Sequence, residues 1–436
     1  MKIRKPPEWG ITPVPQSQRV LRAIDLAVFW TSLGTGLLVY QAGALLVPSL
    51  DFLTSLIVIT AGTLIGTLPL ALAGMIGGKD GVPTMVSLRP SFGIRGSYFP
   101  TWLNVVQLIG WGTLEIAVMA KAGDLISSTT AGFSAYWLWV IVFTIFTILM
   151  GIGGPLLVVK QWLERFAFWL LYGSAAWVTF WALQNGGLSR VVGAKAEGGL
   201  PLLLALDLVI AMPLSWMPLA ADYNRFASTP KGGFLGTYIG FAVGNIVGYA
   251  IGSILILATG SADIVGSFGY LFLGAPALLL ILVYELDNCF ADVYSAAVSM
   301  QNNLPKLKQW VLILLIGGIC AALALFINIE NYIWFLLWIG ATFSPIFGVV
   351  LSHYYILAKQ KIDVEQLYTK GGDYWYSKGV NISAIASWAA GFVVFIVITT
   401  YLSWLGATIP SMLTAAALNI ALAKVQKRIQ VVARRT

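Results

Sequence analysis

The 436-residue sequence has few charged side chains. Asp, Glu, Lys and Arg make up 10% of the chain, whereas soluble globular domains carry roughly 25%. Hydrophobic residues make up 58%. This balance excludes a soluble globular protein.

Histidine and cysteine are also scarce, with one His and two Cys. A zinc site or a catalytic triad cannot be assembled around His353 alone. Cys289 and Cys320 lie inside apolar runs, where we expect them to pack as small residues and not to form a disulfide or a metal site. No nucleophile, metal cluster or cofactor motif is recognisable, so we expect neither an enzyme nor an organic cofactor.

Long apolar runs, by contrast, recur along the whole chain. Each is about 20 residues long, enough to cross a hydrocarbon core of roughly 30 Å at 1.5 Å per residue. The runs predict an all-α polytopic membrane protein whose surroundings are a lipid bilayer. The twelve predicted transmembrane helices lie near residues 24–48, 52–77, 97–126, 131–152, 163–186, 200–222, 233–259, 267–300, 307–327, 331–357, 384–405 and 408–424.

The net charge of +8 raises the question of a nucleic-acid partner, and the placement of the basic residues answers it. If both termini are cytoplasmic, the inside segments hold 23 of the 26 Lys and Arg residues, leaving Arg190 and Lys195 outside and Lys121 within a helix. This asymmetry follows the positive-inside rule. We therefore expect no nucleic acid, a cell-membrane location and two cytoplasmic termini.

The first ten helices divide into two sets of five. An odd number of helices per set inverts the second set relative to the first, which is a recurring plan of transporters. The predicted parts are a cytoplasmic N-terminal segment (1–23), the first five-helix repeat (24–186), the second, inverted repeat (200–357), a cytoplasmic link (358–383), two C-terminal helices (384–424) and a basic cytoplasmic tail (425–436). No cleavable signal precedes the first helix, because the first 22 residues are polar and proline-rich.

The first helix of each set contains residues that interrupt helices. Gly34 to Gly36 stand in the first helix, and Pro213, Ser215 and Pro218 in the sixth. Backbone groups freed by such breaks must be satisfied by protein, water, ion or ligand within the membrane. Paired breaks therefore point to a midplane binding site. Glycine-mediated packing and simple proline kinks are the alternative.

Ionisable residues at membrane depth are candidates for function, because their insertion is costly. Glu115 follows Trp111 by four residues, so both share one helical face. An aromatic plate beside a carboxylate can stack a flat heteroaromatic ring and accept hydrogen bonds from its edge. A Glu115–Lys121 ion pair is the structural alternative.

The predicted eighth helix holds the densest polar cluster. Glu285, Asn288 and Asp292 share a face there, whereas Asp287 points away. Such a face could bind a cation, hold a proton or grip a substrate. The alternative places Glu285 or Asp287 near a helix end in water, or in an interhelical ion pair. Asp25 and Asp207 stand early in broken helices, and we expect them to be structural.

Five segments of the chain resemble the nucleobase:cation symporter family one, the cytosine, purine, uracil, thiamine, allantoin and hydantoin permeases. These segments are E-W-G-I-T-P-V-P from Glu8, R-P-S-F-G-I-R-G from Arg89, I-G-W-G-T-L-E from Ile109, A-D-Y-N-R-F-A from Ala221 and D-N-C-F-A-D-V-Y-S from Asp287. The resemblance spans nearly the whole chain and is closest to cytosine permease-like members.

The resemblance implies a leucine-transporter-type fold of five plus five helices and two more at the C-terminus. It implies a substrate site between helices 1, 3, 6 and 8, with a sodium site between helices 1 and 8. Carried over by motif, the substrate residues are Trp111, Glu115, Ser215, Trp216, Asn288 and Asp292. The cation-coupling residues are Gly34, Leu37, Asp287 and Asn288, with sodium expected at the first three.

Two departures from the family bear on function. Leu286 and Asp287 stand where many relatives have hydroxyl side chains, and Glu115 with Asp292 makes the pocket acidic. The sequence therefore favours an amino-substituted substrate, with cytosine first and hydroxymethylpyrimidine or thiamine-like compounds next. We expect import by alternating access, coupled to H⁺ or Na⁺. A carrier of the same fold for another small solute such as an amino acid, a channel or a transport-independent receptor is the alternative, and the oligomeric state stays open.

Overall fold

The computed structural model describes residues 8–261, 263–268, 274–327 and 332–433. The outer parts of the predicted N-terminal segment and basic tail, and short stretches of the predicted helices 267–300 and 331–357, lie outside the described residues. The described chain is helical apart from turns and two isolated bridges, one of which joins Leu21 to Ala227.

Within the residues that the structure describes, each of the twelve predicted segments falls largely on helix. The long helices are α3 (Phe52–Asp80), α6 (Tyr98–Ala131), α7 (Tyr136–Gly153), α9 (Phe168–Gly186), α13 (Pro230–Thr259), α15 (Gly274–Asn303), α16 (Gln309–Ala324), α17 (Tyr332–Leu351), α18 (Ile382–Tyr401) and α19 (Thr408–Ala433). Within the described ranges, nine helices are long and apolar enough to cross a membrane, or ten with one bent pair.

Helix 1 is broken where its glycines predicted a break. It consists of α1 (Ala23–Leu33) and α2 (Leu37–Ala44), which meet at an angle of 58°. Helix 6 is also interrupted, without a bend of that size: α11 (Leu202–Ser215) gives way to a 3-10 turn, η3 (Met217–Leu219), before α12 (Ala220–Asn224). The predicted pair of interruptions is therefore confirmed. Each interruption leaves backbone groups inside the protein without their helical hydrogen bonds.

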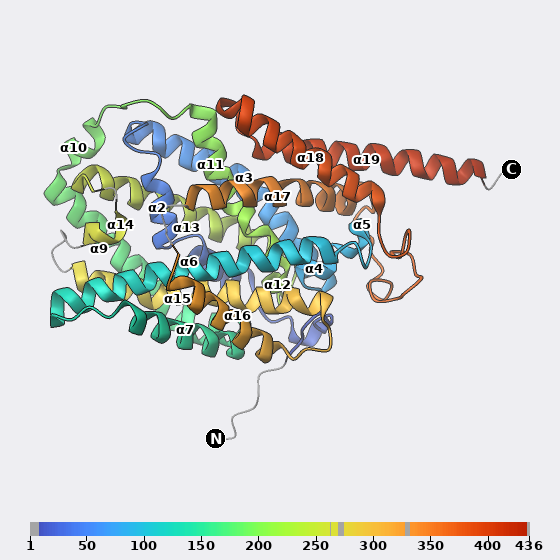
Figure 1. Ribbon diagram of the computed structural model, residues 1–436, viewed down its shortest axis with the longest axis horizontal. Helices are drawn as coiled ribbons and strands as arrows, with labels where there is room; N and C mark the ends of the chain where they lie inside the picture. Colours follow the sequence, from blue (N-terminus) through green and yellow to red (C-terminus); the bar gives the residue numbers. More distant parts are fainter. Residues whose placement is uncertain (1–7, 262, 269–273, 328–331, 434–436) are drawn as a thin grey trace, which may run out of the picture.

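Helices at equivalent places in the two sets of five pack against each other. The second helix of each set forms the pair α3 and α13, the third forms α6 and α15, and the fourth forms α7 and α16. The broken helices lie against the first of these pairs, and α1 also touches α15. Figure 1 shows α6 and α15 running side by side along the molecule, with α18 and α19 as an outer layer. The two breaks thus face the pair of α6 and α15.

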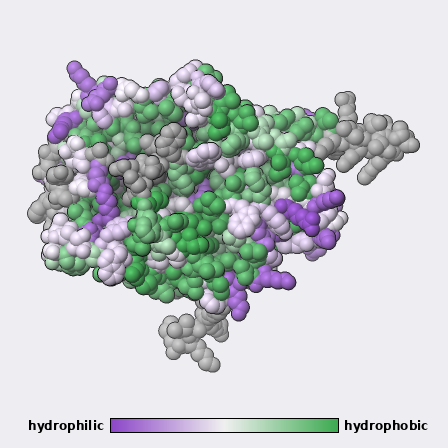
Figure 2. Space-filling model, viewed as in Figure 1, coloured by the Kyte–Doolittle hydropathy of each residue, from purple (hydrophilic) through white to green (hydrophobic). Residues whose placement is uncertain are grey.

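The hydropathy of the surface fits a protein embedded in a bilayer. Figure 2 shows hydrophobic residues over the middle of the visible face and hydrophilic residues gathered toward its two ends. Many large apolar side chains on this protein are exposed, including Ile57, Val106 and Trp169 at 66–69%. Such a surface is stable in hydrocarbon and unstable in water.

The motif residues near one end of the bundle hold the N-terminal segment and the link after helix 10 in place. Arg225 is fully buried and donates to the Gly10 carbonyl at 2.6 Å and to the Tyr294 hydroxyl at 3.1 Å. Arg89, also buried, donates to Asn302 Oδ1 and to the Leu367 carbonyl. These arginines are structural.

Two features of the fold differ from the expected ranges. Residues Val158–Ala167, before α9, form a π-helix, and α19 continues past residue 424 to Ala433. Apolar periodicity marks the membrane-embedded part of a helix and does not distinguish π from α winding, which differ by one residue per hydrogen-bonded ring.

Candidate functional site

One face of α6 carries three polar or aromatic side chains in successive turns. Gln107, Trp111 and Glu115 are spaced by four residues, and all are at most 8% exposed. The Gln107 amide donates to the Ser215 carbonyl at 3.1 Å, which ties α6 to the interruption of helix 6. The Trp111 indole meets Phe335 of α17 edge to face, with ring centroids 5.2 Å apart.

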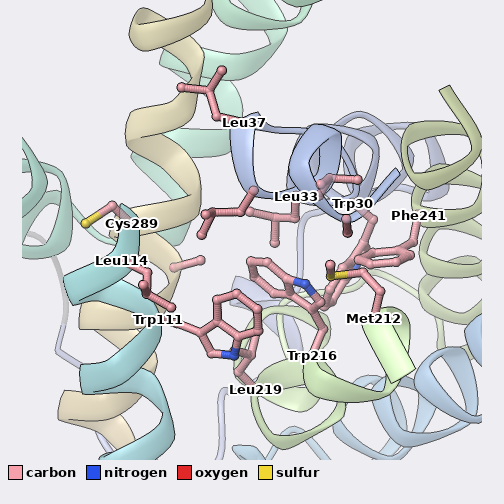
Figure 3. Packing of buried hydrophobic residues seen from close by; sticks show 14 of the residues in the cluster. Trp30, Leu33, Leu37, Trp111, Leu114, Met212, Trp216, Leu219, Phe241 and Cys289 are labelled. Carbon is pink, nitrogen blue, oxygen red and sulfur yellow. The ribbon is translucent and has the colours of Figure 1, made fainter. Parts of the chain in front are cut away.

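The interruption of helix 6 places a second indole beside the first. Trp216 ends α11, is 9% exposed and lies 6.3 Å from the Phe241 ring of α13. Figure 3 shows Trp111 and Trp216 converging on the space between α6 and the broken helices. The Ser215 hydroxyl donates back to the Met212 carbonyl at 2.7 Å, so in this conformation it serves its own helix.

Helix 8 reaches the break of helix 1 through two side chains of α15. The Leu37 amide donates to Glu285 Oε1 at 3.0 Å and to Oε2 at 3.1 Å, and Asn288 Nδ2 donates to the Thr35 carbonyl at 3.2 Å. A Cβ on Gly36 would lie 2.8 Å from both Asn288 Nδ2 and Glu285 Oε1. Only glycine leaves room for this approach.

The carboxyl groups of Glu115 and Glu285 lie beside each other across the α6 and α15 pair, about one turn along each helix from the contact of Cys289 Sγ with the Gly112 carbonyl at 3.8 Å. Glu115 is 4% exposed and Glu285 is fully buried. Two carboxylates cannot form a hydrogen bond to each other unless one carries a proton. The second oxygen of Glu115, Oε2, is buried and has no hydrogen-bond partner among the described residues.

Two further carboxyls of α15 flank this pair. Asp287 is fully buried beside the Ser32 hydroxyl of α1, and neither of its oxygens makes a well-formed hydrogen bond within the described ranges. Asp292, at 3% exposure, lies one turn beyond Asn288, near Gly112 of α6. The predicted division of faces is confirmed, since Asp287 turns toward α1 while Glu285 and Asn288 meet the break.

The structure corrects two alternatives considered for these carboxyls. Lys121 does not pair with Glu115: its ammonium lies 3.0 Å from Asp263, at the opposite end of the bundle from the N-terminal segment. Glu285 and Asp287 lie neither in water nor in an ion pair of the described residues. The spacing of six residues between Glu115 and Lys121 places them on different sides of α6, which accounts for the first result.

Asp25 and Asp207 lie outside the site and serve helix ends. Asp25 accepts from the Arg22 amide at 2.8 Å and pairs with Lys160 at 2.5 Å. Asp207 accepts from the Ala407 and Thr408 amides at 2.9 and 3.0 Å, at the start of α19. Both roles are structural, as the sequence indicated.

The residues expected to bind sodium differ in what they offer. Asp287 presents buried oxygens beside Ser32, a donor set that suits a hard cation. Leu37 presents an amide N–H that Glu285 already accepts, and Gly34 packs against the backbone of Phe241 and Asn245. His, Cys, Asp and Glu side chains do not gather in threes around any point in the described part of the chain.

Sequence reasoning gave no role to Gln107 or Ser32. It placed Gly36 in the break of helix 1 and Glu285 on the polar face of helix 8, without assigning their contacts. Gln107 carried a usable signal, because it precedes Trp111 by the same four residues that separate Trp111 from Glu115. Glu285 stood in the dense polar region. Its contacts with Leu37 and Glu115 depend on how separate helices pack, which periodicity within one helix cannot show.

Comparison with known proteins gives consistent matches over nearly the whole length. A sequence family described as permeases for cytosine/purines, uracil, thiamine and allantoin matches residues 13–421. A purine-uracil permease of Arabidopsis thaliana is 25% identical over 88% of this chain and 70% of its own length. An allantoin permease of Bacillus subtilis is 25% identical over 89% and 86%, and a cytosine permease of Escherichia coli is 25% identical over 78% and 80%.

Solved structures show the same fold. A nucleobase-cation-symport-1 family transporter, in a closed conformation with bromovinylhydantoin bound, matches with a TM-score of 0.84 at 19% identity over 96% of this chain and 95% of that one. A Na⁺-coupled sialic acid symporter matches with a TM-score of 0.70 at 13% identity over 97% and 93%. The fold is therefore the leucine-transporter-type inverted repeat.

Proposed function

Because this chain belongs to the family of permeases for cytosine/purines, uracil, thiamine and allantoin, we propose that it imports an amino-substituted pyrimidine by cation-coupled alternating access. Cytosine is the first candidate substrate, with hydroxymethylpyrimidine and thiamine-like compounds next. The charge asymmetry of the loops supports a cell-membrane location with both termini in the cytoplasm.

One observation carries the choice of substrate: the buried carboxyl of Glu115 stands one turn from Trp111 on α6, and Trp111 lies beside Trp216 (Figure 3). Two indoles suit a flat ring, since stacking of a base on an aromatic side chain contributes about 1–3 kcal/mol. The unpartnered Glu115 Oε2 is an acceptor, so it suits an exocyclic amino group. Asn288 and Asp292 extend the polar edge of the same site.

Uracil, allantoin and hydantoin suit this site less well, although other family members are named for them. These compounds present imide or ureide edges, on which carbonyl oxygens flank the N–H groups. A carbonyl oxygen facing Glu115 Oε2 pairs two acceptors, which costs free energy in a buried site. An amino-substituted edge avoids this conflict.

The coupling cation is H⁺ or Na⁺. Asp287 with Ser32, and the Glu115–Glu285 pair, are the two places beside the break of helix 1 where buried oxygens could hold it. The first lies between helices 1 and 8, and the second joins helix 3 to helix 8, where Glu285 also meets the break of helix 1. A cation there would bias the angle between α1 and α2 and so link ion binding to the closure of the site.

Uptake into proteoliposomes tests the proposal. Purified protein is reconstituted, and labelled cytosine, hydroxymethylpyrimidine and thiamine are offered with H⁺ and Na⁺ gradients imposed separately. We expect saturable, gradient-dependent accumulation of at least one of the three, and exchange with unlabelled substrate on the far side. Flux without saturation or exchange would indicate a channel, and binding without flux would indicate a receptor.

An amino acid or another small solute is the alternative substrate, because this fold also serves a sialic acid symporter. Ligand-induced thermal stabilisation separates the alternatives, since a ligand that binds only the folded state raises the melting temperature. Nucleobases, thiamine precursors and amino acids are screened against the wild type and Glu115→Gln. Stabilisation by amino acids alone would refute the pyrimidine assignment.

A further inference from the structure

We propose that the Glu115–Glu285 carboxyl pair holds the coupling proton, and that this proton allows the break of helix 1 to close against helix 8. The inference rests on the proposed transport function and identifies the ion and its binding residues.

The carboxyls of Glu115 and Glu285 have different surroundings. This difference determines which of the two carries the proton. Glu285 accepts from the Leu37 amide through both oxygens and interacts with the Asn288 amide, so donors surround its charged form. A helix N-terminus also favours negative charge, and Leu37 begins α2. Within the described ranges, no donor outside this pair reaches Glu115, and its Oε2 is buried without a partner. Glu115 therefore carries the proton and donates it toward Glu285.

The charged groups facing the pair all have the same sign. Glu115 faces Glu285, Asp292 and Asp287, all on α15, and the groups of α2 that meet Glu285 are uncharged backbone. Lys121 and Lys160 pair with Asp263 and Asp25 instead. Without a proton, Glu115 and Glu285 would be two buried negative charges in contact, an arrangement that proteins resolve by protonation.

The same contact explains how a proton could control the break. When the pair is unprotonated, repulsion separates Glu115 from Glu285, and Glu285 can no longer bridge α6 and the start of α2. When the pair is protonated, Glu285 binds the Leu37 amide and Glu115 at once, and Gly36 fits against Asn288. The buried, unpartnered Oδ1 of Asn288 and Oε2 of Glu115 then remain as acceptors for substrate N–H groups.

The proton step balances. With the site open to the outside, hydronium gives one proton to the ionised pair and leaves as water. With the site open to the inside, water removes that proton from Glu115 as hydronium. One proton therefore accompanies each substrate molecule, with no further reactant.

Uptake of labelled cytosine and hydroxymethylpyrimidine into Na⁺-free proteoliposomes tests the inference. At one proton per substrate, a gradient of about one pH unit should drive about tenfold accumulation by the wild type. In Glu115→Gln, whose amide can donate to Glu285 but cannot release a proton, we expect this accumulation to fall to the level without a gradient while counterflow exchange persists. Asp263→Asn is the matched control. It removes a carboxyl that pairs with Lys121, which lies on α6 together with Glu115, and it should keep the tenfold accumulation.

A second measurement needs no variant and covers a failure of Glu115→Gln to fold. In weakly buffered vesicles without Na⁺, substrate added in excess outside should carry protons inward. A pH-sensitive dye inside the vesicles reports this proton movement. Uptake driven by Na⁺ with no proton movement would overturn the proton inference and leave the transporter assignment intact. Retained pH-driven accumulation in Glu115→Gln would also overturn it. Absence of uptake of both compounds under every gradient would overturn the transport assignment and this inference with it.

Discussion

Glu285 of α15 binds the backbone amide of Leu37, the first residue of α2, through both carboxyl oxygens at 3.0 and 3.1 Å. A carboxylate from the second repeat thus caps the helix end that the break in the first repeat creates. The free amides at a helix N-terminus need such a partner, above all inside a membrane. The conformation in which helix 1 meets helix 8, here called the closed form, depends on this contact.

Replacing Glu285 should therefore destabilise the closed form. In Glu285→Ala the Leu37 amide loses its acceptor, and a buried unsatisfied amide costs about 1–3 kcal/mol. We expect a lower melting temperature in detergent and loss of accumulation. Glu285→Gln keeps an oxygen acceptor and should recover most of the stability, so equal melting temperatures for Glu285→Ala and the wild type would contradict the capping role.

A methyl group at Gly36 should block the same contact sterically. A Cβ there would lie 2.8 Å from Asn288 Nδ2 and from Glu285 Oε1, which is closer than real Cβ contacts. We expect Gly36→Ala to reach the membrane and to lose transport. Gly318→Ala is the control, because a Cβ on that glycine of α16 meets nothing within 4 Å. Equal transport by the two variants would show that the close approach is not needed.

The positions of the helices could be predicted from the sequence, and the reason is physical. A membrane-crossing helix must be predominantly apolar over about 20 residues, so α3 and α13 are visible as continuous runs. Gly34 and Gly36 in the first helix and Pro213 in the sixth marked both interruptions, because each weakens or removes a helical hydrogen bond.

The polar site could be predicted only in part. Trp111 and Glu115 were grouped by their spacing on one helix, and the structure keeps them on one buried face of α6. The contact of Glu115 with Glu285 joins residues far apart in the chain, so it depends on the packing of α6 on α15. No pattern within a single helix specifies that register.

Removing the indole of Trp111 should weaken ligand binding. Stacking on an aromatic side chain contributes about 1–3 kcal/mol, so Trp111→Ala should lower affinity for the stacked ligand roughly 5- to 150-fold. Trp137→Ala is the control, because Trp137 lies on the outer surface at 61% exposure. Ligand-induced thermal shifts measure both, and an unchanged shift in Trp111→Ala would remove Trp111 from the binding site.

Loss of the Arg225 guanidinium should free the N-terminal segment. Arg225 donates to the Gly10 carbonyl, the Tyr294 hydroxyl and the Asp222 carbonyl from a fully buried position. A lysine presents one ammonium in place of this planar fork, so Arg225→Lys should lose at least one of the three bonds. We expect faster proteolytic cleavage within residues 8–22 than in the wild type or in Lys231→Gln, which changes an exposed basic residue nearby. Unchanged cleavage would show that other contacts suffice to hold the segment.

The ion pair between Lys121 and Asp263 should contribute little to the free energy of unfolding. The size of this contribution distinguishes it from an ion pair between Lys121 and Glu115. The two side chains are 49% and 46% exposed, and exposed pairs typically contribute about 0.2–1 kcal/mol. If Lys121 instead neutralised the buried Glu115, its removal would leave a buried charge unpaired at a cost of about 3–5 kcal/mol. A double-mutant cycle over Lys121→Gln and Asp263→Asn measures the coupling by thermal unfolding in detergent. We expect a small coupling between these two residues and unchanged ligand-induced stabilisation in Lys121→Gln. A large loss of stability in Lys121→Gln that Glu115→Gln reverses would return Lys121 to the binding site and require the charge balance around Glu115 to be revised.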